Sequence, residues 1–318
     1  MSSIEYDFCG LLISSPLDFY SFRRSPVVSP GIVDVTLSLT AGAMPPGRSV
    51  RHAWQGRFGL TLEGDARTGW VIRCGDDLAI ICDAAGTVLD CRCHDADDIP
   101  LLREILSRRI LPRLTLLHRR LPIHAAAVAR RDDAVLMFGA SGAGKSTLTA
   151  AMAAAGWDIM SDDMTVLTGA EDARVWQSAP GVSLWEASRL GLALPDTTCR
   201  AIEGYDGKYW YAPPHRARAG TVPVGAMVFL SFDTACDAIE WRPISGPTAM
   251  VMAASQMVRF DPADKDESGR MLDSIGRLVR RIPCYTLTYP RIYAALPQTI
   301  EAITAIQDHA REQAEADL

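Results

Sequence analysis

The sequence predicts a mixed α/β protein in which a smaller, mostly β N-terminal domain precedes a larger α/β domain. Three observations support this. Short runs rich in β-branched and aromatic residues, separated by Gly, Pro and Asp, fill the first hundred residues. A helical pattern follows them, and then a strand, a glycine-rich loop and a helix-forming run succeed one another. We therefore expect a β domain over residues 1–98, a helical linker over 99–120 and an α/β domain over 121–318.

The expected strands of the N-terminal domain alternate with turn residues. The clearest are Ile32–Leu39, Phe58–Leu62, Gly69–Arg73 and Leu78–Cys82. The segment after residue 98 changes to a helical period with one apolar face. This face consists of Leu101, Leu102, Ile105, Leu106 and Ile110. Pro112 predicts a kink or a break in this helix, and the arginines of the segment indicate a solvated face more than a surface for an acidic partner.

From about Leu121 onward, strand and helix signals alternate as in an α/β domain. The last of them are a strand over Cys284–Thr288 and a helix around Leu296–Ile306. The final dozen residues are polar and acidic, which predicts a frayed tail.

The composition excludes several classes of function. A formal net charge of −6 argues against a nucleic-acid-binding protein, which needs a basic surface. No apolar run approaches the roughly 18 residues of a membrane span, and the first residues lack the features of a signal peptide. We therefore expect a cytoplasmic protein whose eight scattered cysteines are reduced and buried. The spacing of Cys91, Cys93 and His94 is too short for a usual zinc site.

Residues 139–146 read Gly-Ala-Ser-Gly-Ala-Gly-Lys-Ser, a complete phosphate-binding loop pattern. The apolar run Ala134–Phe138 precedes it as a strand, a run rich in Ala, Leu and Met follows it as a helix, and Gly156 stands where this helix would end. In such a loop, backbone N–H groups and the positive end of the helix face a phosphate. The alternative is a glycine turn that binds no ligand. The strand expected before the motif and the helix expected after it make this alternative less favourable.

The pattern predicts a site for a nucleoside triphosphate such as ATP, together with Mg²⁺. Lys145 would reach the β- and γ-phosphate oxygens, and the Ser146 hydroxyl would hold the metal. The residues expected to contact the nucleotide are Gly139, Ala140, Ser141, Gly142, Ala143, Gly144, Lys145, Ser146 and Thr147.

His124 opens an apolar run that we expect to form a β-hairpin with the strand before the loop. The charged residues 130–133 form the turn of this hairpin. If Ala129 pairs with Ala134, His124 lies opposite Gly139, beside the triphosphate. A lone histidine in an apolar run is usually structural, but this position favours a role in proton exchange.

Two adjacent carboxylates, Asp162 and Asp163, follow the short strand expected over residues 156–160. The next strand of an α/β sheet runs parallel to the previous one, so its carboxyl end opens on the same edge as the loop. One acid would then help to hold Mg²⁺, and the other would accept the proton of an acceptor hydroxyl. A solvated turn is the alternative. This set of residues favours phosphoryl transfer to a peptide or protein hydroxyl over hydrolysis.

Two further segments are weaker candidates. Glu186 would lie near the metal, or it would simply begin a helix. Residues 204–220 are dense in aromatic and basic side chains, so that Lys208, Arg216 and Arg218 would clamp the transferred phosphoryl group or capture the acceptor. A surface hairpin with ordinary solvated charges explains the same segment equally well.

These motifs together resemble one family. A strand that opens with His124, a glycine loop that ends in Lys-Ser, and an Asp-Asp pair after the next strand are similar to the catalytic domain of HPr serine kinase/phosphorylase. The phosphate-binding core of that domain is itself similar to phosphoenolpyruvate carboxykinases. The resemblance covers residues 121–166 well and the rest of the chain loosely. It implies a domain of this fold over residues 121–318.

The resemblance also implies roles for individual residues. By this match, Lys145 and Ser146 bind ATP and Mg²⁺. His124 and Asp162 form the base that deprotonates the acceptor serine, and Asp163 helps at the metal.

The chain departs from the family in its substrate-binding features. The family's second glycine-rich signature is absent, and the N-terminal region differs from the family's regulatory domain. The chain looks more like the divergent relatives found in ribosomal peptide biosynthesis, especially lasso-peptide kinases, which phosphorylate the C-terminal serine of a precursor peptide. This resemblance implies a peptide or small-protein partner and, as in other relatives, a possible homo-oligomer. An HPr-type serine kinase/phosphorylase, a regulatory nucleotide-binding module and a small-molecule kinase are the alternatives.

Overall fold

The computed structural model describes residues 3–25, 33–55, 58–214, 220–232 and 238–316. The chain is a mixed α/β protein that divides into two compact units. The first unit comprises residues 1–120 and 259–269, and the second comprises residues 121–258 and 270–318. The helical segment expected as a linker over residues 99–120 is therefore part of the first unit.

Over the residues that the structure describes, the strands of the first unit form one nine-stranded sheet with the order β3-β1-β2-β4-β9-β8-β7-β6-β5. Its strands are β1 (Ile4–Phe8), β2 (Leu11–Ser15), β3 (Arg23–Arg24), β4 (Val35–Ala41), β5 (Val50–Ala53), β6 (Leu60–Asp65), β7 (Gly69–Cys74), β8 (Leu78–Cys82) and β9 (Val88–Cys93). The runs read from the sequence correspond to β4, β6, β7 and β8. Ile32, the first residue of one of them, lies outside the described residues.

The helical segment of the first unit is interrupted just before Pro112, as the sequence predicts. A short 3-10 turn, η1 (Ala96–Asp98), leads into helix α1 (Ile99–Ile105). This helix continues into a π-helical turn, η2 (Leu106–Ile110), and then into helix α2 (Leu111–Leu114). Because Pro112 has no N–H group, it cannot donate the hydrogen bond that would continue the α-helical pattern.

The apolar face of this helical segment explains why it belongs to the first unit. Leu102 and Ile105 are buried, and they line one small cavity together with Leu60 and Ile72 of the sheet. Burial of such side chains is worth about 1.5–3 kcal/mol each, so the segment is held on the sheet and does not act as a free linker.

The second unit is built on a larger mixed sheet. Strands β13, β11, β12, β19, β21 and β20 lie side by side in this order; β12, β19 and β21 are parallel, and the other pairs are antiparallel. Strands β15, β14 and β10 continue from β19, and β16, β18 and β17 form a separate small sheet. The bounds are β10 (Leu121–Ile123), β11 (Ala126–Arg130), β12 (Asp133–Phe138), β13 (Asp158–Ser161), β14 (Thr165–Leu167), β15 (Arg174–Trp176), β16 (Val182–Trp185), β17 (Cys199–Ala201), β18 (Lys208–Tyr211), β19 (Thr221–Phe232), β20 (Glu240–Pro243) and β21 (Cys284–Tyr289).

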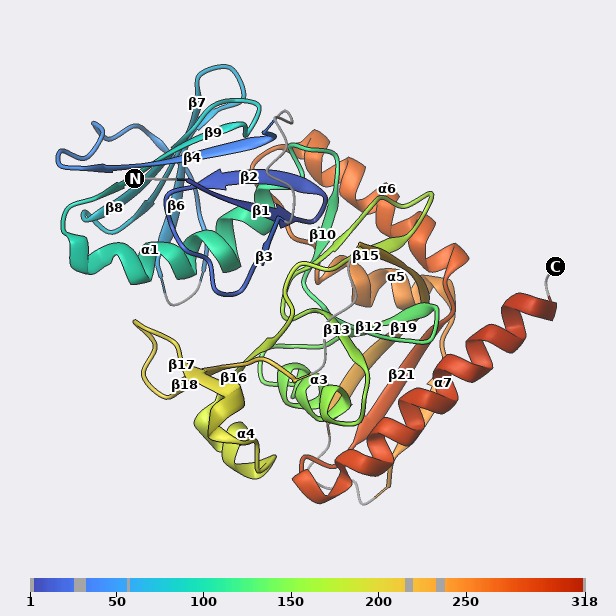
Figure 1. Ribbon diagram of the computed structural model, residues 1–318. Helices are drawn as coiled ribbons and strands as arrows, with labels where there is room; N and C mark the ends of the chain where they lie inside the picture. Colours follow the sequence, from blue (N-terminus) through green and yellow to red (C-terminus); the bar gives the residue numbers. More distant parts are fainter. Residues whose placement is uncertain (1–2, 26–32, 56–57, 215–219, 233–237, 317–318) are drawn as a thin grey trace. The chain divides into compact units, whose positions relative to one another are not determined.

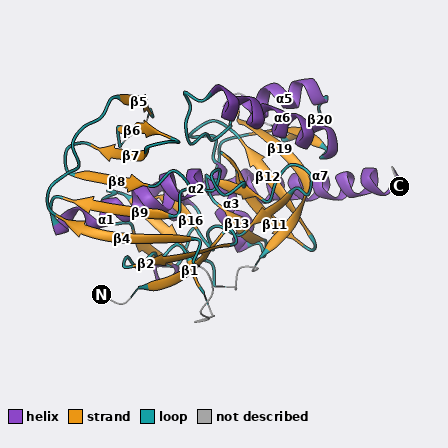
Figure 2. Ribbon diagram, turned by 90° about the horizontal axis from the view of Figure 1, so that it is seen from above, coloured by secondary structure: helices purple, strands orange, loops and turns teal. Residues whose placement is uncertain are grey.

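Helices pack around the sheets of this unit, α4 against β16 and β18 of the small sheet, and Figure 1 follows them along the chain. They are α3 (Lys145–Ala154), α4 (Glu186–Gly191), α5 (Gly246–Ala254), α6 (Lys265–Arg281) and α7 (Leu296–Ala316), with short 3-10 turns η3 (Asp196–Thr198) and η4 (Tyr293–Ala295). Helix α7 packs on β19 and β20 and also contacts α3. Figure 2 shows α5 and α6 together on one side of β12 and β19. Over the described residues, none of the helices is both long and apolar enough to cross a membrane.

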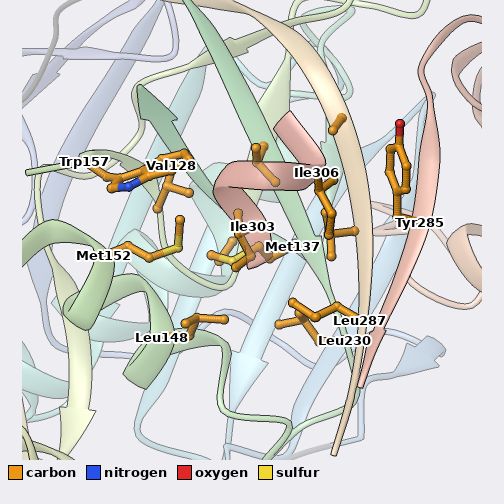
Figure 3. Packing of buried hydrophobic residues seen from close by; sticks show 14 of the residues in the cluster. Val128, Met137, Leu148, Met152, Trp157, Leu230, Tyr285, Leu287, Ile303 and Ile306 are labelled. Carbon is orange, nitrogen blue, oxygen red and sulfur yellow. The ribbon is translucent and has the colours of Figure 1, made fainter. Parts of the chain in front are cut away.

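The main core of the second unit lies between the sheet and the helices α3 and α7 (Figure 3). Leu148 and Met152 of α3 meet Ile303 and Ile306 of α7 over the strands, and all four side chains are fully buried. The opposite side of α3 packs against a second apolar cluster that includes Leu184 of the small sheet. Helix α3 is therefore held from two sides, which fixes the position of its first turn.

The C-terminal segment is helical to Ala316, so the expectation of a frayed tail over the last dozen residues is wrong. Ala310 is buried against the sheet, and Arg311 Nε donates to Asp133 Oδ2 at 2.6 Å. The prediction failed because it relied on the polar composition of the segment. An amphipathic helix needs only a few apolar residues to pack on one side.

We expect Arg311→Ala to lower the free energy of unfolding by about 2 kcal/mol. The change would leave the Asp133 carboxylate, which is only 15% exposed, without its cation. Arg131→Ala is the matched control, because Arg131 pairs with Asp308 where the two side chains are 55% and 44% exposed. Such an exposed pair contributes less than about 1 kcal/mol. Chemical denaturation measures both variants, and equal losses would contradict a stabilising role for the Arg311 pair.

Candidate functional site

The glycine-rich loop connects the end of β12 to the first residue of α3, as the sequence predicts. Gly142 and Gly144 have φ values of 83° and 84°, a left-handed conformation that favours glycine. Gly139 is needed for a different reason, because a Cβ at this position would lie 2.9 Å from Ala143 Cβ. Gly156, with φ of 90°, ends the helix where the sequence places its end. The loop thus requires glycine for its left-handed backbone at Gly142 and Gly144 and for space at Gly139.

Tyr289, the last residue of β21, supports the loop from a strand that lies beyond β19 in the same sheet. Its hydroxyl donates to the Ala143 carbonyl at 2.7 Å, and a Cβ at Gly144 would lie 2.8 Å from the same hydroxyl. Burial raises the pKa of Tyr289 to about 12, so the hydroxyl keeps its proton as a donor. Sequence reasoning missed this residue. The sequence could have indicated it, because Tyr289 follows a predicted strand and the carboxyl ends of parallel strands meet at one edge of a sheet.

We expect Gly144→Ala to destabilise the protein more than Gly142→Ala. Both changes place alanine in a left-handed conformation, at a cost of about 1–2 kcal/mol. The new Cβ at position 144 would meet the Tyr289 hydroxyl, whereas nothing lies within 4 Å of a Cβ at position 142. Adding Tyr289→Phe to both variants should remove the difference between their thermal midpoints. If the difference persists in that background, the tyrosine hydroxyl is not its cause.

Lys145 is buried at the centre of the site. Its ammonium group donates to the Gly139 carbonyl at 2.6 Å and lies 3.3 Å from His124 Nε2. Burial lowers the pKa of Lys145, whereas the negative charges of Asp163 and Asp162 act in the opposite direction. The amine is thus held at the mouth of the loop by carbonyl and imidazole acceptors.

The hairpin that brings His124 to the loop has the predicted register. Ala129 pairs with Ala134, and Ala126 pairs with Met137. The ladder ends there, so His124 does not pair with Gly139 as expected. It lies instead at the junction of β10 and β11, where its backbone N–H donates to the Gln256 carbonyl at 2.9 Å. The imidazole nevertheless reaches the loop through Lys145.

Asp162 and Asp163 follow β13 at the same edge of the sheet as the loop. Strand β13 is antiparallel to β11, which is antiparallel to β12, so β13 points in the same direction as β12. The expected direction is therefore confirmed, although β11 lies between the two strands. Asp162 accepts a hydrogen bond from Ser146 Oγ at 2.8 Å and from the Ser183 N–H at 2.9 Å.

Asp163 makes a different contact from its neighbour. Its Oδ1 lies 3.3 Å from Nδ1 of His124, and the side chains are 37% and 28% exposed respectively. Its φ of 68° is left-handed, a conformation that aspartate adopts more readily than most residues. Because an ammonium group only donates hydrogen bonds, Lys145 requires Nε2 of His124 to be the acceptor. The imidazole proton then lies on Nδ1 and faces the Asp163 carboxylate.

The weaker candidates lie as follows. Glu186 begins α4 and is exposed, in agreement with the simpler of its two interpretations. Lys208 begins β18, and its ammonium lies 5.0 Å from the ring centre of Trp185 and 5.1 Å from that of Tyr205. This aromatic contact holds Lys208 by cation–π attraction. Arg216 and Arg218 lie outside the described residues.

The structure contains no preformed metal cluster among the residues that it describes, in the sense of three or more His, Cys, Asp or Glu side chains. Cys91 and Cys93 are free and buried in β9, as the sequence predicts, whereas Cys74 and Cys199 are only partly buried, so the expectation of burial is wrong for these two. Burial raises the pKa of the Cys91 and Cys93 thiols, which keeps them protonated.

Comparisons with known proteins do not assign the chain to a family. No family model matches it, and no curated protein matches it either.

Proposed function

We propose that the second unit is a phosphate-loop domain of the HPr-kinase-like type, and that the protein is an ATP- and Mg²⁺-dependent serine kinase. One observation carries the proposal. The imidazole, the loop lysine and the two carboxylates lie around one glycine loop, joined by contacts of 2.8 Å from Ser146 to Asp162 and 3.3 Å from His124 to both Lys145 and Asp163. Three separate segments of the chain thus meet at one point.

The residues of the loop fit a triphosphate with its metal. The left-handed glycines and the first turn of α3 provide backbone N–H groups for phosphate oxygens. Ser146 Oγ and Asp162 provide adjacent hard oxygen donors, which is the donor type that Mg²⁺ prefers. Bound there, the metal would neutralise charge on the β- and γ-phosphates.

The contacts favour a division of labour between the two acids that reverses the one implied by the family resemblance. Asp162 adjoins the Ser146 hydroxyl and suits the metal. Asp163 accepts from His124 and suits the role of base. In the reaction, the acceptor oxygen forms a bond to the γ-phosphorus while the bond to the β,γ-bridging oxygen breaks. The hydroxyl proton passes to Asp163, ADP leaves, and His124 orients the carboxylate through Nδ1–H.

The acceptor class follows from the resemblance and from the chemistry. A base beside the γ-phosphate serves transfer to a hydroxyl, whereas a regulatory nucleotide-binding module does not need one. The resemblance to lasso-peptide kinases makes the C-terminal serine of a precursor peptide the first candidate acceptor.

A direct assay tests this proposal. The protein is incubated with ATP, Mg²⁺ and the short peptides encoded beside its gene, each made also with its terminal serine changed to alanine. Mass spectrometry should detect one added phosphoryl group on the serine peptide and none on the alanine peptide. If the protein binds the nucleotide but no peptide gains a phosphoryl group, the result supports a regulatory nucleotide-binding module instead.

A further inference from the structure

Strand β16 connects one of the candidate catalytic carboxylates to an exposed tryptophan. The Ser183 N–H donates to Asp162 Oδ2 at 2.9 Å, and Trp185 follows two residues later at the end of the strand. Because a strand rises about 3.3 Å per residue, the backbone of Trp185 lies about 7 Å from that of Ser183. A peptide whose hydroxyl lies beside Asp163 can therefore also contact Trp185.

Trp185 combines a largely exposed side chain with a fixed backbone. It is 54% exposed, whereas tryptophan is highly buried on average. It pairs with Lys208 in the ladder between β16 and β18, and the N–H of the next residue, Glu186, donates to the Gly207 carbonyl at 2.8 Å. A large aromatic side chain on such a backbone provides contact area at a small cost in conformational entropy. Trp185 is therefore suited to anchor a partner.

Lys208 brings a positive charge to the same place. Residues that pair directly across an antiparallel ladder lie on one face of the sheet, so Lys208 lies beside Trp185. Its ammonium is 5.0 Å from the ring centre of Trp185 and 5.1 Å from that of Tyr205, which is only 9% exposed. The two rings hold the ammonium in place, so less side-chain entropy is lost when it binds an anion.

The charges around the candidate site indicate what this ammonium is suited to bind. An acceptor whose serine is the last residue carries an α-carboxylate next to the reacting hydroxyl. Asp162 and Asp163 repel such a carboxylate. Lys145 is buried and lies at the Gly139 carbonyl, where it would serve the phosphates. A second cation would offset the repulsion, and Lys208 lies in the small sheet whose strand β16 contacts Asp162.

We infer that Trp185 and Lys208 bind the acceptor peptide at its C-terminus. The Lys208 ammonium pairs with the α-carboxylate of the terminal serine, and the Trp185 ring packs on the residue before it. The inference rests on the proposed function, and it adds the reason why a terminal serine is chosen over an internal one. The small sheet thus recognises the acceptor, and Asp163 takes its proton.

A comparison of two forms of the acceptor tests this. Each short peptide encoded beside the gene is made with a free C-terminal carboxylate and with a C-terminal amide. The wild-type protein should phosphorylate the acid with a kcat/KM about tenfold or more above that of the amide. Lys208→Met should reduce this preference to about twofold or less, because methionine has no charge, whereas Lys208→Arg should retain most of it. Lys265→Met is the matched control, because Lys265 is an exposed lysine of α6, and it should keep the full preference.

The contribution of the aromatic ring is measured separately. Trp185→Ala should raise the KM of the acid form about threefold to tenfold without lowering kcat. Val251→Ala is the control for loss of an exposed apolar side chain, because Val251 of α5 is 73% exposed, and it should change neither constant. A lower kcat with an unchanged KM in Trp185→Ala would show that this ring does not bind the peptide.

The outcomes separate the inference from the proposed function. If the wild-type protein phosphorylates neither form, the proposed function fails and the inference fails with it. If it phosphorylates both forms equally, or if Lys208→Met keeps the preference, Lys208 does not bind the carboxylate although the kinase activity stands. A folded Lys208→Met variant that phosphorylates neither form would move Lys208 from recognition to catalysis and would overturn the inference.

Discussion

Lys145→Ala is expected to lower the rate of phosphoryl transfer by about 10³-fold or more. Lys145 is the buried cation at the mouth of the loop, so its loss removes the positive charge that would stabilise the β- and γ-phosphates in the transition state. Removal of a single neutral donor from such a site already costs about 10²–10³-fold. Steady-state turnover of the serine peptide measures the effect.

Lys265→Ala is the control for this change. Lys265 is an exposed lysine at the start of α6, so the variant carries the same change in net charge. It should retain the wild-type rate, and circular dichroism should show that both variants are folded. Unchanged turnover of Lys145→Ala would remove the glycine loop from the mechanism.

Asp163→Asn is expected to reduce kcat by about 10²-fold or more while the affinity for Mg·ATP stays within about threefold of wild type. The amide keeps the shape of the side chain but cannot take the acceptor proton. Asp162→Asn is expected to affect nucleotide affinity more than kcat, because it removes a carboxylate charge beside Ser146. Its main effect should be a loss of Mg²⁺-dependent nucleotide affinity of about tenfold or more.

The two aspartate variants act as controls for each other. Adjacent in sequence and identical in chemistry, they differ in the contacts of 2.8 Å to Ser146 and 3.3 Å to His124. Titration with ATP at several Mg²⁺ concentrations separates binding from turnover. A large kcat effect at Asp162 with intact catalysis at Asp163 would restore the assignment that the family resemblance implies.

Local rules were sufficient to predict the elements around the loop. Strand β12, the glycine loop and α3 follow from a motif with its own backbone requirements, and the hairpin register follows from the short charged turn before Asp133. The direction of β13 follows from the order strand, helix, strand, because a helix between two strands returns the chain to the end of the sheet where the first strand began. These features depend on residues close together in the chain.

Features that depend on distant residues were not predicted. The support of the loop by Tyr289 involves a residue 146 positions away, and the end of α7 is stabilised by Arg311 reaching Asp133 across 178 positions. Which aspartate faces Ser146 and which faces His124 depends on the left-handed turn at Asp163, which the sequence alone does not specify.

The most direct test is a crystal structure of the protein with Mg²⁺ and a non-hydrolysable ATP analogue. We expect the γ-phosphate within hydrogen-bond distance of Lys145 Nζ, the metal on Ser146 and Asp162, and the Asp163 carboxylate facing the position from which a hydroxyl would attack. A nucleotide bound elsewhere on the chain, or a γ-phosphate that points away from all of these side chains, would contradict the proposed kinase site.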